Sequence, residues 1–126
     1  IELKEIFMSI KRKTTLGSIK ISDDAIATLT GGAVIECYGV VGMTSQKMFK
    51  DGFNELLKRE NYSKGVIIKN KDNGIEVDLY VVIGYGVKVT EVINEIQKRV
   101  KYTLEKALEL DVLSVNVFVQ GIKVIE

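Results

Sequence analysis

The sequence contains no histidine, no proline and no tryptophan, and it has a single cysteine, Cys37. Without histidine, the chain cannot build a Ser-His-Asp catalytic triad, a His-ligated zinc site or an imidazole acid–base catalyst. One cysteine cannot form a disulfide within the chain, which indicates a reducing compartment such as the cytoplasm. These absences exclude a large part of the usual enzyme repertoire.

Long hydrophobic runs and an excess of charge are also missing. The longest apolar runs are only a few residues, such as Tyr80–Ile83, whereas a membrane-spanning helix needs about 20. A net charge of +1 gives no overall reason to bind nucleic acid or acidic lipid. What is present is an ordinary globular composition, 46% hydrophobic and 28% charged over 126 residues, which is enough for one domain with a buried core.

Hydrophobic periodicity predicts two main helices and four strands. Ser22, followed by two aspartates, is typical of a helix N-terminus, and apolar spacings of three and four predict a helix over residues 23–37. A longer amphipathic helix is predicted over residues 89–110. The strands are predicted at residues 39–43, 66–70, 75–86 and 113–124, with a hairpin turn at Asn73-Gly74.

These elements predict an α+β fold, a two-layer α/β sandwich. Its small mixed sheet carries two main helices on one face, in the order helix, strand, short helix, two strands, helix, strand. The short helix is predicted within residues 46–65, where Phe49, Phe53, Leu56 and Leu57 share one face. Residues 1–15 are predicted to form a flexible N-terminal arm, and residues 16–126 a single domain.

Residues 30–44, TGGAVIECYGVVGMT, gather four glycines around Cys37 and could suggest a catalytic or phosphate site. Cys37 lies on the apolar stripe near a helix C-terminus, where the dipole disfavours a thiolate, so a core position is predicted. Phosphate loops run from a strand into a helix N-terminus, whereas this segment runs from a helix into a strand. We therefore predict packing here, and no catalytic, cofactor-binding or metal-binding residue in the chain.

The run Gly39–Gly42 also matches the GxxG loop with which KH domains clamp RNA. The two intervening valines favour a buried strand over a solvated loop. An RNA-binding module with a KH-like fold, contacting phosphates through Lys98, Arg99 and Lys101, is the alternative hypothesis. An enzyme or small-molecule carrier with a pocket hidden from sequence reasoning is the third.

The open face of the sheet is the stronger candidate for a binding surface. Strand alternation predicts that Glu76 and Asp78 lie there as exposed charges. Four apolar side chains are predicted to share that face as a partner interface: Tyr80, Val82, Phe118 and Ile122. The competing expectation is that the N-terminal arm or residues 49–57 cover this face.

Five segments resemble, in order, the successive blocks of the alkaline shock protein family of Gram-positive bacteria: GSIKISDDAIA, GGAVIECYGVVGM, VDLYVVIGYGVKVTEV, IQKRVKYTLEKAL and VNVFVQGIKV. The resemblance covers nearly the whole predicted domain. It implies a cytoplasmic, non-enzymatic protein of the envelope stress response that self-associates and is held near the membrane by a separate membrane-anchored partner. The branch that the chain resembles also implies a fatty-acid-kinase-like protein as a candidate partner.

The residues and the resemblance agree on one hypothesis. The chain is expected to be a binding or scaffolding protein that forms homo-oligomers and docks to a membrane-anchored or metabolic partner. No cofactor, nucleic acid or direct membrane insertion is expected.

Overall fold

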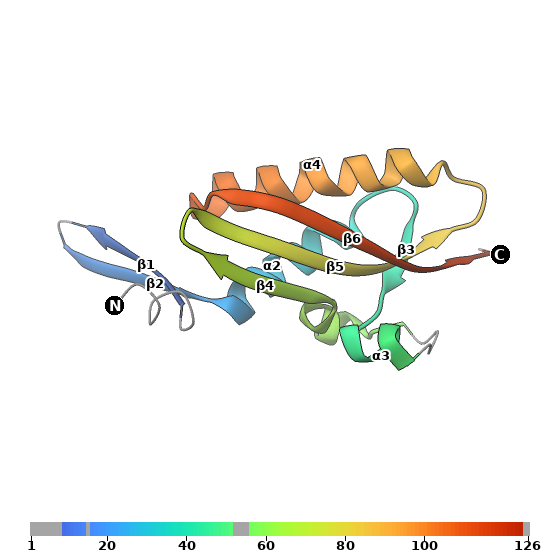
Figure 1. The fold of residues 1–126 in the computed structure, drawn as a ribbon, viewed down its shortest axis with the longest axis horizontal. Helices are drawn as coiled ribbons and strands as arrows, with labels where there is room; N and C mark the ends of the chain where they lie inside the picture. The colour runs from blue at the N-terminus through green and yellow to red at the C-terminus, as the bar shows by residue number, and fades with distance from the viewer. Residues whose placement is uncertain (1–8, 15, 52–55, 125–126) are drawn as a thin grey trace.

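A four-stranded sheet with two helices on one face forms the body of the protein (Figure 1). The structure is a computed structural model and describes residues 9–14, 16–51 and 56–124. The strands are β3 (Val40–Met43), β4 (Val66–Lys71), β5 (Gly74–Gly84) and β6 (Val112–Lys123), and the helices are α2 (Asp23–Ile35) and α4 (Val89–Leu108). The predicted two-layer α+β architecture is confirmed.

The sheet is mixed and is built around β5. Strands β3 and β4 pair antiparallel with β5, whereas β6 pairs parallel with it because α4 carries the chain back between them. Lys71 pairs with Gly74, so the hairpin turn falls on Asp72 and Asn73, one residue earlier than predicted. Gly74, with φ of 152°, provides the left-handed backbone at the start of β5.

Helix α2 begins as its sequence predicts and ends slightly early. Ser22 is the N-cap, and its Oγ accepts a hydrogen bond from Ala25 N at 3.1 Å. The helix ends at Ile35, two residues before the predicted end, and a turn leads into β3. In that turn Gly39 has φ of 92°, and a Cβ there would lie 2.7 Å from Val92 Cγ2. Glycine is therefore required both for the turn and for the close approach of α4.

The core lies between the helices and one face of the sheet. Helix α4 buries a single stripe against it: Val92, Ile96, Val100 and Leu104. From the sheet, alternate residues of β5 meet that stripe: Val77, Leu79, Val81 and Ile83. Cys37 is 4% exposed in the same core, and burial raises the pKa of its thiol. It is therefore a packing residue, as the sequence predicts.

The N-terminal segment differs from the flexible arm that the sequence predicts over residues 1–15. Strand β1 (Ser9–Thr14) pairs antiparallel with β2 (Gly17–Ser22), and this hairpin extends away from the body of the protein (Figure 1). Residues 1–8 and 15 lie outside the described residues. The expected extended segment before α2 is thus one strand of a hairpin.

The segment between β3 and β4 is not the single short helix that the sequence predicts. It contains α3 (Gln46–Asp51) and a 3-10 helix, η1 (Arg59–Gly65), while residues 52–55, and with them Phe53, lie outside the described residues. Ser45 Oγ caps α3 by accepting a hydrogen bond from Met48 N at 3.1 Å. A Cβ on Gly31 would lie 3.1 Å from the Tyr62 Cβ, so this glycine lets η1 pack closely on α2.

Candidate functional site

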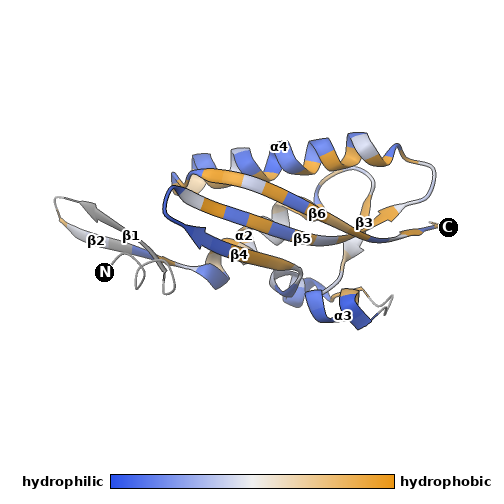
Figure 2. Cartoon of the chain, in the orientation of Figure 1, coloured by the Kyte–Doolittle hydropathy of each residue, from blue (hydrophilic) through white to orange (hydrophobic). Residues whose placement is uncertain are grey.

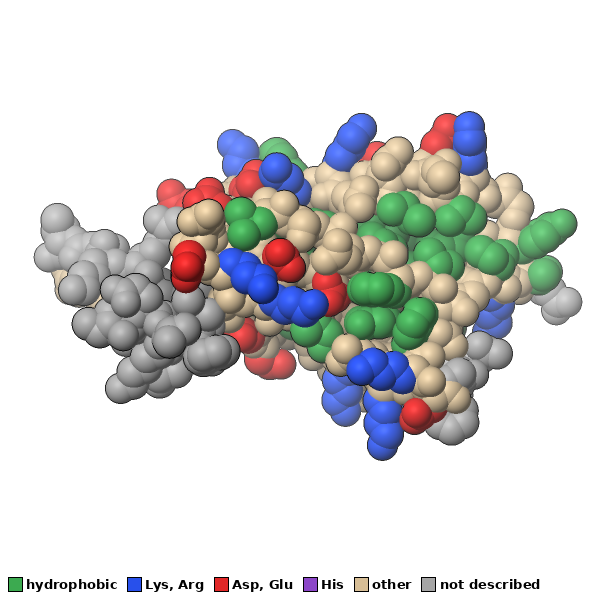
Figure 3. All heavy atoms as spheres, in the orientation of Figure 1, with side chains coloured by type: hydrophobic (Ala, Val, Ile, Leu, Met, Phe, Trp, Pro, Cys, Tyr) green, Lys and Arg blue, Asp and Glu red, His purple; other side chains and the backbone are tan. Residues whose placement is uncertain are grey.

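The candidate site is the face of the sheet turned away from α2 and α4, which we call the outer face. Strand pairing brings its side chains together from three strands: Ile67 and Lys69 of β4, Glu76, Asp78, Tyr80 and Val82 of β5, and Asn116 and Phe118 of β6. Figure 3 shows this face, with hydrophobic side chains gathered over one part of β5 and β6 and charged side chains over the other. The face thus has an apolar half and a polar half.

Three aromatic rings, which we call the aromatic cluster, form the apolar half. Tyr80 and Phe118 stack with their centroids 4.9 Å apart, and Phe49 of α3 meets them edge-on at 5.1 and 6.0 Å. Phe49 can reach this position because α3 closely follows β3, which pairs with β5. As a result Tyr80 is only 5% exposed, whereas Phe118 at the open side is 38% exposed.

Phe49 of α3 and Leu56 therefore cover part of the outer face, in line with the competing expectation from the sequence, and residues 52–55 of that segment lie outside the described residues. Leu56 packs beside the cluster against Gly42, which has no side chain. A Cβ at position 42 would lie only 3.0 Å from Leu56 Cδ2. Val82, which pairs with Gly42, is 5% exposed. Of the four predicted interface residues, Tyr80 and Val82 are buried, and Phe118 remains accessible.

Ile122 does not lie with the other three, and its predicted place on the outer face is wrong. The pairing register shifts between Val81 and Val82 of β5, because Gln120 is an extra residue in β6. After this β-bulge Ile122 pairs with Ile83, whose side chain is in the core, so Ile122 points to the helix side of the sheet. It is 49% exposed because it lies near the end of an edge strand.

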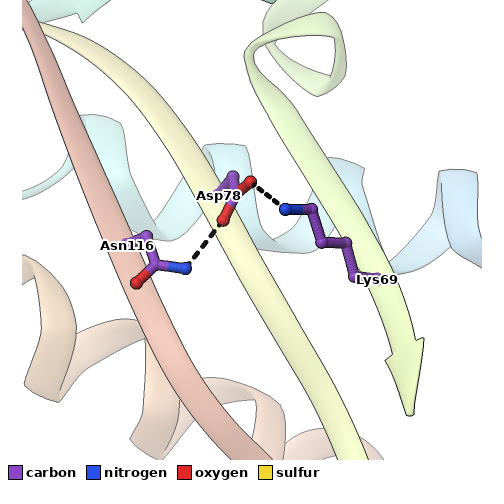
Figure 4. A network of polar contacts seen from close by, with 3 residues as sticks. All are labelled: Lys69, Asp78 and Asn116. Atoms are coloured by element: carbon purple, nitrogen blue, oxygen red, sulfur yellow. Dashed lines mark hydrogen bonds and ion pairs between the residues drawn. The ribbon is translucent and has the colours of Figure 1, made fainter.

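Asp78 is the centre of the polar half, and the prediction that it is exposed is also wrong. It is 4% exposed, and both carboxylate oxygens have partners (Figure 4). Asn116 Nδ2 donates to Oδ1 at 2.8 Å, and Lys69 Nζ lies 2.9 Å from Oδ2. The hydrogen bond and the charge of Asp78 raise the pKa of Lys69, whose side chain is 49% exposed. The two neighbouring strands thus pair a buried carboxylate: β4 supplies the counter-charge and β6 a hydrogen-bond donor.

A comparison with known proteins identifies the family. The model of the Asp23 family, described as having a cell envelope-related function, matches residues 11–124. This chain belongs to the Asp23 family. The family name is independent of residue Asp23 in α2. The match confirms the resemblance to alkaline shock proteins.

Several relatives of this Asp23-family protein are similar over nearly their whole length. The uncharacterized protein Spy1614 of Streptococcus pyogenes is 52% identical over 118 residues, covering 94% of this chain and 98% of that protein. The uncharacterized protein YloU of Bacillus subtilis is 44% identical, covering 93% and 98%. YqhY, also uncharacterized and from B. subtilis, is 31% identical, covering 87% and 80%. No solved structure matches the chain.

The structure of this Asp23-family protein also describes the regions on which the alternative hypotheses rest. Residues Val40–Met43 pair antiparallel with β5, so the GVVG run is a strand rather than a solvated RNA-binding loop. Lys98, Arg99 and Lys101 are exposed on α4. Within the described ranges, no three His, Cys, Asp or Glu side chains gather as a metal site requires. An open groove of about 550 Å³ lies between α2, η1 and α4, lined by Gly32, Arg59 and Thr103 among others.

Sequence reasoning missed Lys69 as a member of the outer face, and it did not predict the contacts that Phe49 and Asn116 make there. The hairpin register at Asp72 and Asn73 could have placed Lys69 beside Glu76 and Asp78, because a two-residue turn fixes strand pairing. Strand alternation places Asn116 on the outer face, but no comparable signal shows that Asn116 bonds Asp78 or that Phe49 covers Tyr80. Both contacts join distant parts of the chain.

Proposed function

We propose that this protein is a non-enzymatic binding or scaffolding protein that docks to a partner protein through the outer face of its sheet. The family supplies the broader context, a cell envelope-related function. The finer role, within the envelope stress response, is part of the proposal and follows the resemblance to alkaline shock proteins.

The aromatic cluster is the observation that carries this proposal. Phe118 is 38% exposed while one face of its ring stacks on the buried Tyr80, so it is held in place without a partner. Aromatic side chains fixed in this way supply contact area at little cost in conformational entropy, and they dominate the energy of many interfaces. Beside the cluster, Asp78 is already paired, so a partner would not have to neutralise a buried charge.

We further propose self-association and a cytoplasmic location at the membrane through a membrane-anchored partner protein. Of the helices that the structure describes, none is both long enough and apolar enough to span a bilayer. A fatty-acid-kinase-like protein is the second candidate partner. Both partners follow from the resemblance to the family, and the outer face is the surface on which we expect them to compete.

Exchanging one exposed aromatic residue tests the proposal. Phe118→Ser should weaken binding to the membrane-anchored partner or to the fatty-acid-kinase-like protein by at least tenfold, which is about 1.4 kcal/mol of binding free energy. Tyr102→Ser, which removes a 64% exposed aromatic side chain from α4, should leave the affinity unchanged. Titration of each purified candidate against wild type and both variants, after circular dichroism has confirmed folding, measures the effect.

Equal affinity of wild type and Phe118→Ser for every partner that binds would contradict docking through the outer face. A loss of affinity in Tyr102→Ser alone would move the binding surface to α4.

A further inference from the structure

The hairpin of β1 and β2 concentrates positive charge. Residues 9–22 contain four basic residues and no acidic one: Lys11, Arg12, Lys13 and Lys20. The chain as a whole has a net charge of only +1, so this concentration is not apparent from the overall composition. Figure 2 shows that the hairpin extends away from the hydrophobic strands of the sheet. Its charge therefore lies apart from the body of the protein.

Strand pairing places three of these basic residues on one face of the hairpin. Directly opposite residues of an antiparallel pair share a face, and so do residues two apart on one strand. Lys11 is paired with Lys20, and Lys13 is paired with Ser18. We call Lys11, Lys13 and Lys20 the lysine face. Like charges directly opposite each other destabilise a strand pair, so a negatively charged surface would relieve the repulsion between Lys11 and Lys20.

The tip of the hairpin carries an exposed hydrophobic residue. Leu16 is 98% exposed, the largest exposed fraction among the large hydrophobic side chains of the described residues. Ile21, at the other end of β2, packs against the core. Burial of the Leu16 side chain in an apolar medium would be favourable. Because an isolated two-stranded hairpin is only marginally stable in water, the hairpin would also be stabilised by a surface that binds it.

We propose that the hairpin of β1 and β2 binds directly to the surface of an anionic lipid bilayer. The lysine face attracts the negatively charged headgroups, and Leu16 enters the boundary between headgroups and acyl chains. Lys11 and Lys20 form the third pair behind Thr14 and Gly17, about 10 Å along the hairpin. The whole lysine face thus lies within about one Debye length, roughly 10 Å, of a bilayer that the tip touches.

Leu16 favours a bilayer over a nucleic acid as the binding partner. Lysines attract the phosphates of both, but a nucleic acid backbone would leave the leucine in water. The cell envelope-related function of the family also agrees with a membrane surface. This inference goes beyond the membrane-anchored partner proposed above, because it gives the chain a contact of its own with lipid.

Vesicles that contain no protein test the inference. Wild type should sediment with vesicles made of equal parts phosphatidylcholine and phosphatidylglycerol. It should bind vesicles of phosphatidylcholine alone more weakly by at least about tenfold. Added salt should weaken the binding to the mixed vesicles, because it screens the attraction between charges. Docking of a partner protein to the outer face plays no part in this measurement.

Removal of the lysine face should have the largest effect on vesicle binding. The combined variant Lys11→Gln, Lys13→Gln and Lys20→Gln should bind the mixed vesicles about a hundredfold more weakly, because each lysine near an anionic surface contributes about fivefold. Circular dichroism first establishes that the variant keeps the helices of the body.

The same loss of charge on α4 is the matched control. Lys98→Gln, Arg99→Gln and Lys101→Gln combined lower the net charge by the same amount, and all three residues are exposed. This variant should bind the mixed vesicles as wild type does. An equal loss of affinity in both combined variants would show that binding depends on net charge alone, and the hairpin would not be the site.

A substitution at the tip separates a bilayer from a nucleic acid. Leu16→Ser should weaken binding to the mixed vesicles by about tenfold, because it removes the burial of a leucine. Tyr102→Ser, which removes a 64% exposed aromatic side chain from α4, should have no effect. Unchanged vesicle binding by Leu16→Ser would contradict the entry of the tip into the bilayer. Binding of wild type to a single-stranded RNA oligonucleotide but not to vesicles would replace the bilayer by a nucleic acid.

Failure of this inference can be told apart from failure of the proposed docking. If wild type does not bind the mixed vesicles but binds a partner protein in a Phe118-dependent way, this inference is wrong and the docking function stands. Vesicle binding that depends on the lysine face, without binding to either candidate partner, gives the converse.

Discussion

Alternate residues of β5 are buried on both faces of the sheet, but different structures bury them. On the helix side, Val77, Leu79, Val81 and Ile83 are all 0% exposed beneath α2 and α4. On the outer face, Asp78, Tyr80 and Val82 are 4–5% exposed beneath the six-residue helix α3, the side chain of Leu56 and one ion pair. The comparison shows that low exposure alone does not identify the core. The outer face is covered by few side chains, and Phe118 remains 38% exposed beside them.

The largest expected effect is on the helix side. Leu79→Ala should lower the free energy of unfolding by about 2–5 kcal/mol, because it removes buried methyl groups and leaves a cavity between β5 and the helices. Urea denaturation followed by circular dichroism measures the change. A loss below about 1 kcal/mol would show that the two layers are not closely packed at this position.

An intermediate effect is expected where α3 covers the outer face. Phe49→Ala should cost about 1–3 kcal/mol, less than a fully buried Phe→Ala substitution, because Phe49 is only half-buried. The variant should also expose Tyr80, which near-UV circular dichroism can detect. If Phe49→Ala costs as much as Leu79→Ala, the outer face is a second core, and the contrast between the two faces fails.

The smallest effect is expected at the ion pair. Asp78 raises the pKa of Lys69 above its usual value of 10.5, so the folded state holds this proton more tightly than the unfolded state. The resulting stability is fully present below about pH 10.5 and is lost as pH rises through the higher folded pKa. Because Lys69 is half-exposed, solvent screens the pair, and the loss should be small.

Lys69→Met isolates this contribution. Its free energy of unfolding should fall less steeply than that of wild type above about pH 10. Parallel pH curves for the two proteins would show that Lys69 and Asp78 do not interact in solution.

The main elements of the fold could be predicted because their patterns are local. The cap at Ser22 and the apolar stripe of α4 both follow from neighbouring residues, and the structure confirms both. The lack of histidine, and the place of Cys37 on an apolar stripe near a helix C-terminus, were likewise enough to predict a buried thiol. The strand at Ser9–Thr14 was missed, because its pairing with β2 is weakly marked in the sequence.

The candidate site could be predicted only in part. Period-two alternation correctly placed Tyr80, Val82 and Phe118 on one face, but it could not reveal the bulge that turns Ile122 to the other side. It also could not show that Phe49 covers Tyr80, or that Lys69 and Asn116 bury Asp78. Each of these features depends on contacts between segments that are distant in sequence.

By itself, the sequence determined the layers of this protein, the burial of Cys37 and the family to which it belongs. Periodicity and capping are properties of consecutive residues, so they can be read without coordinates. Only the tertiary structure decided which outer-face residues are accessible and how β6 is registered on β5. Those properties depend on where α3 rests and on which strands flank β5, and no stretch of consecutive residues encodes either.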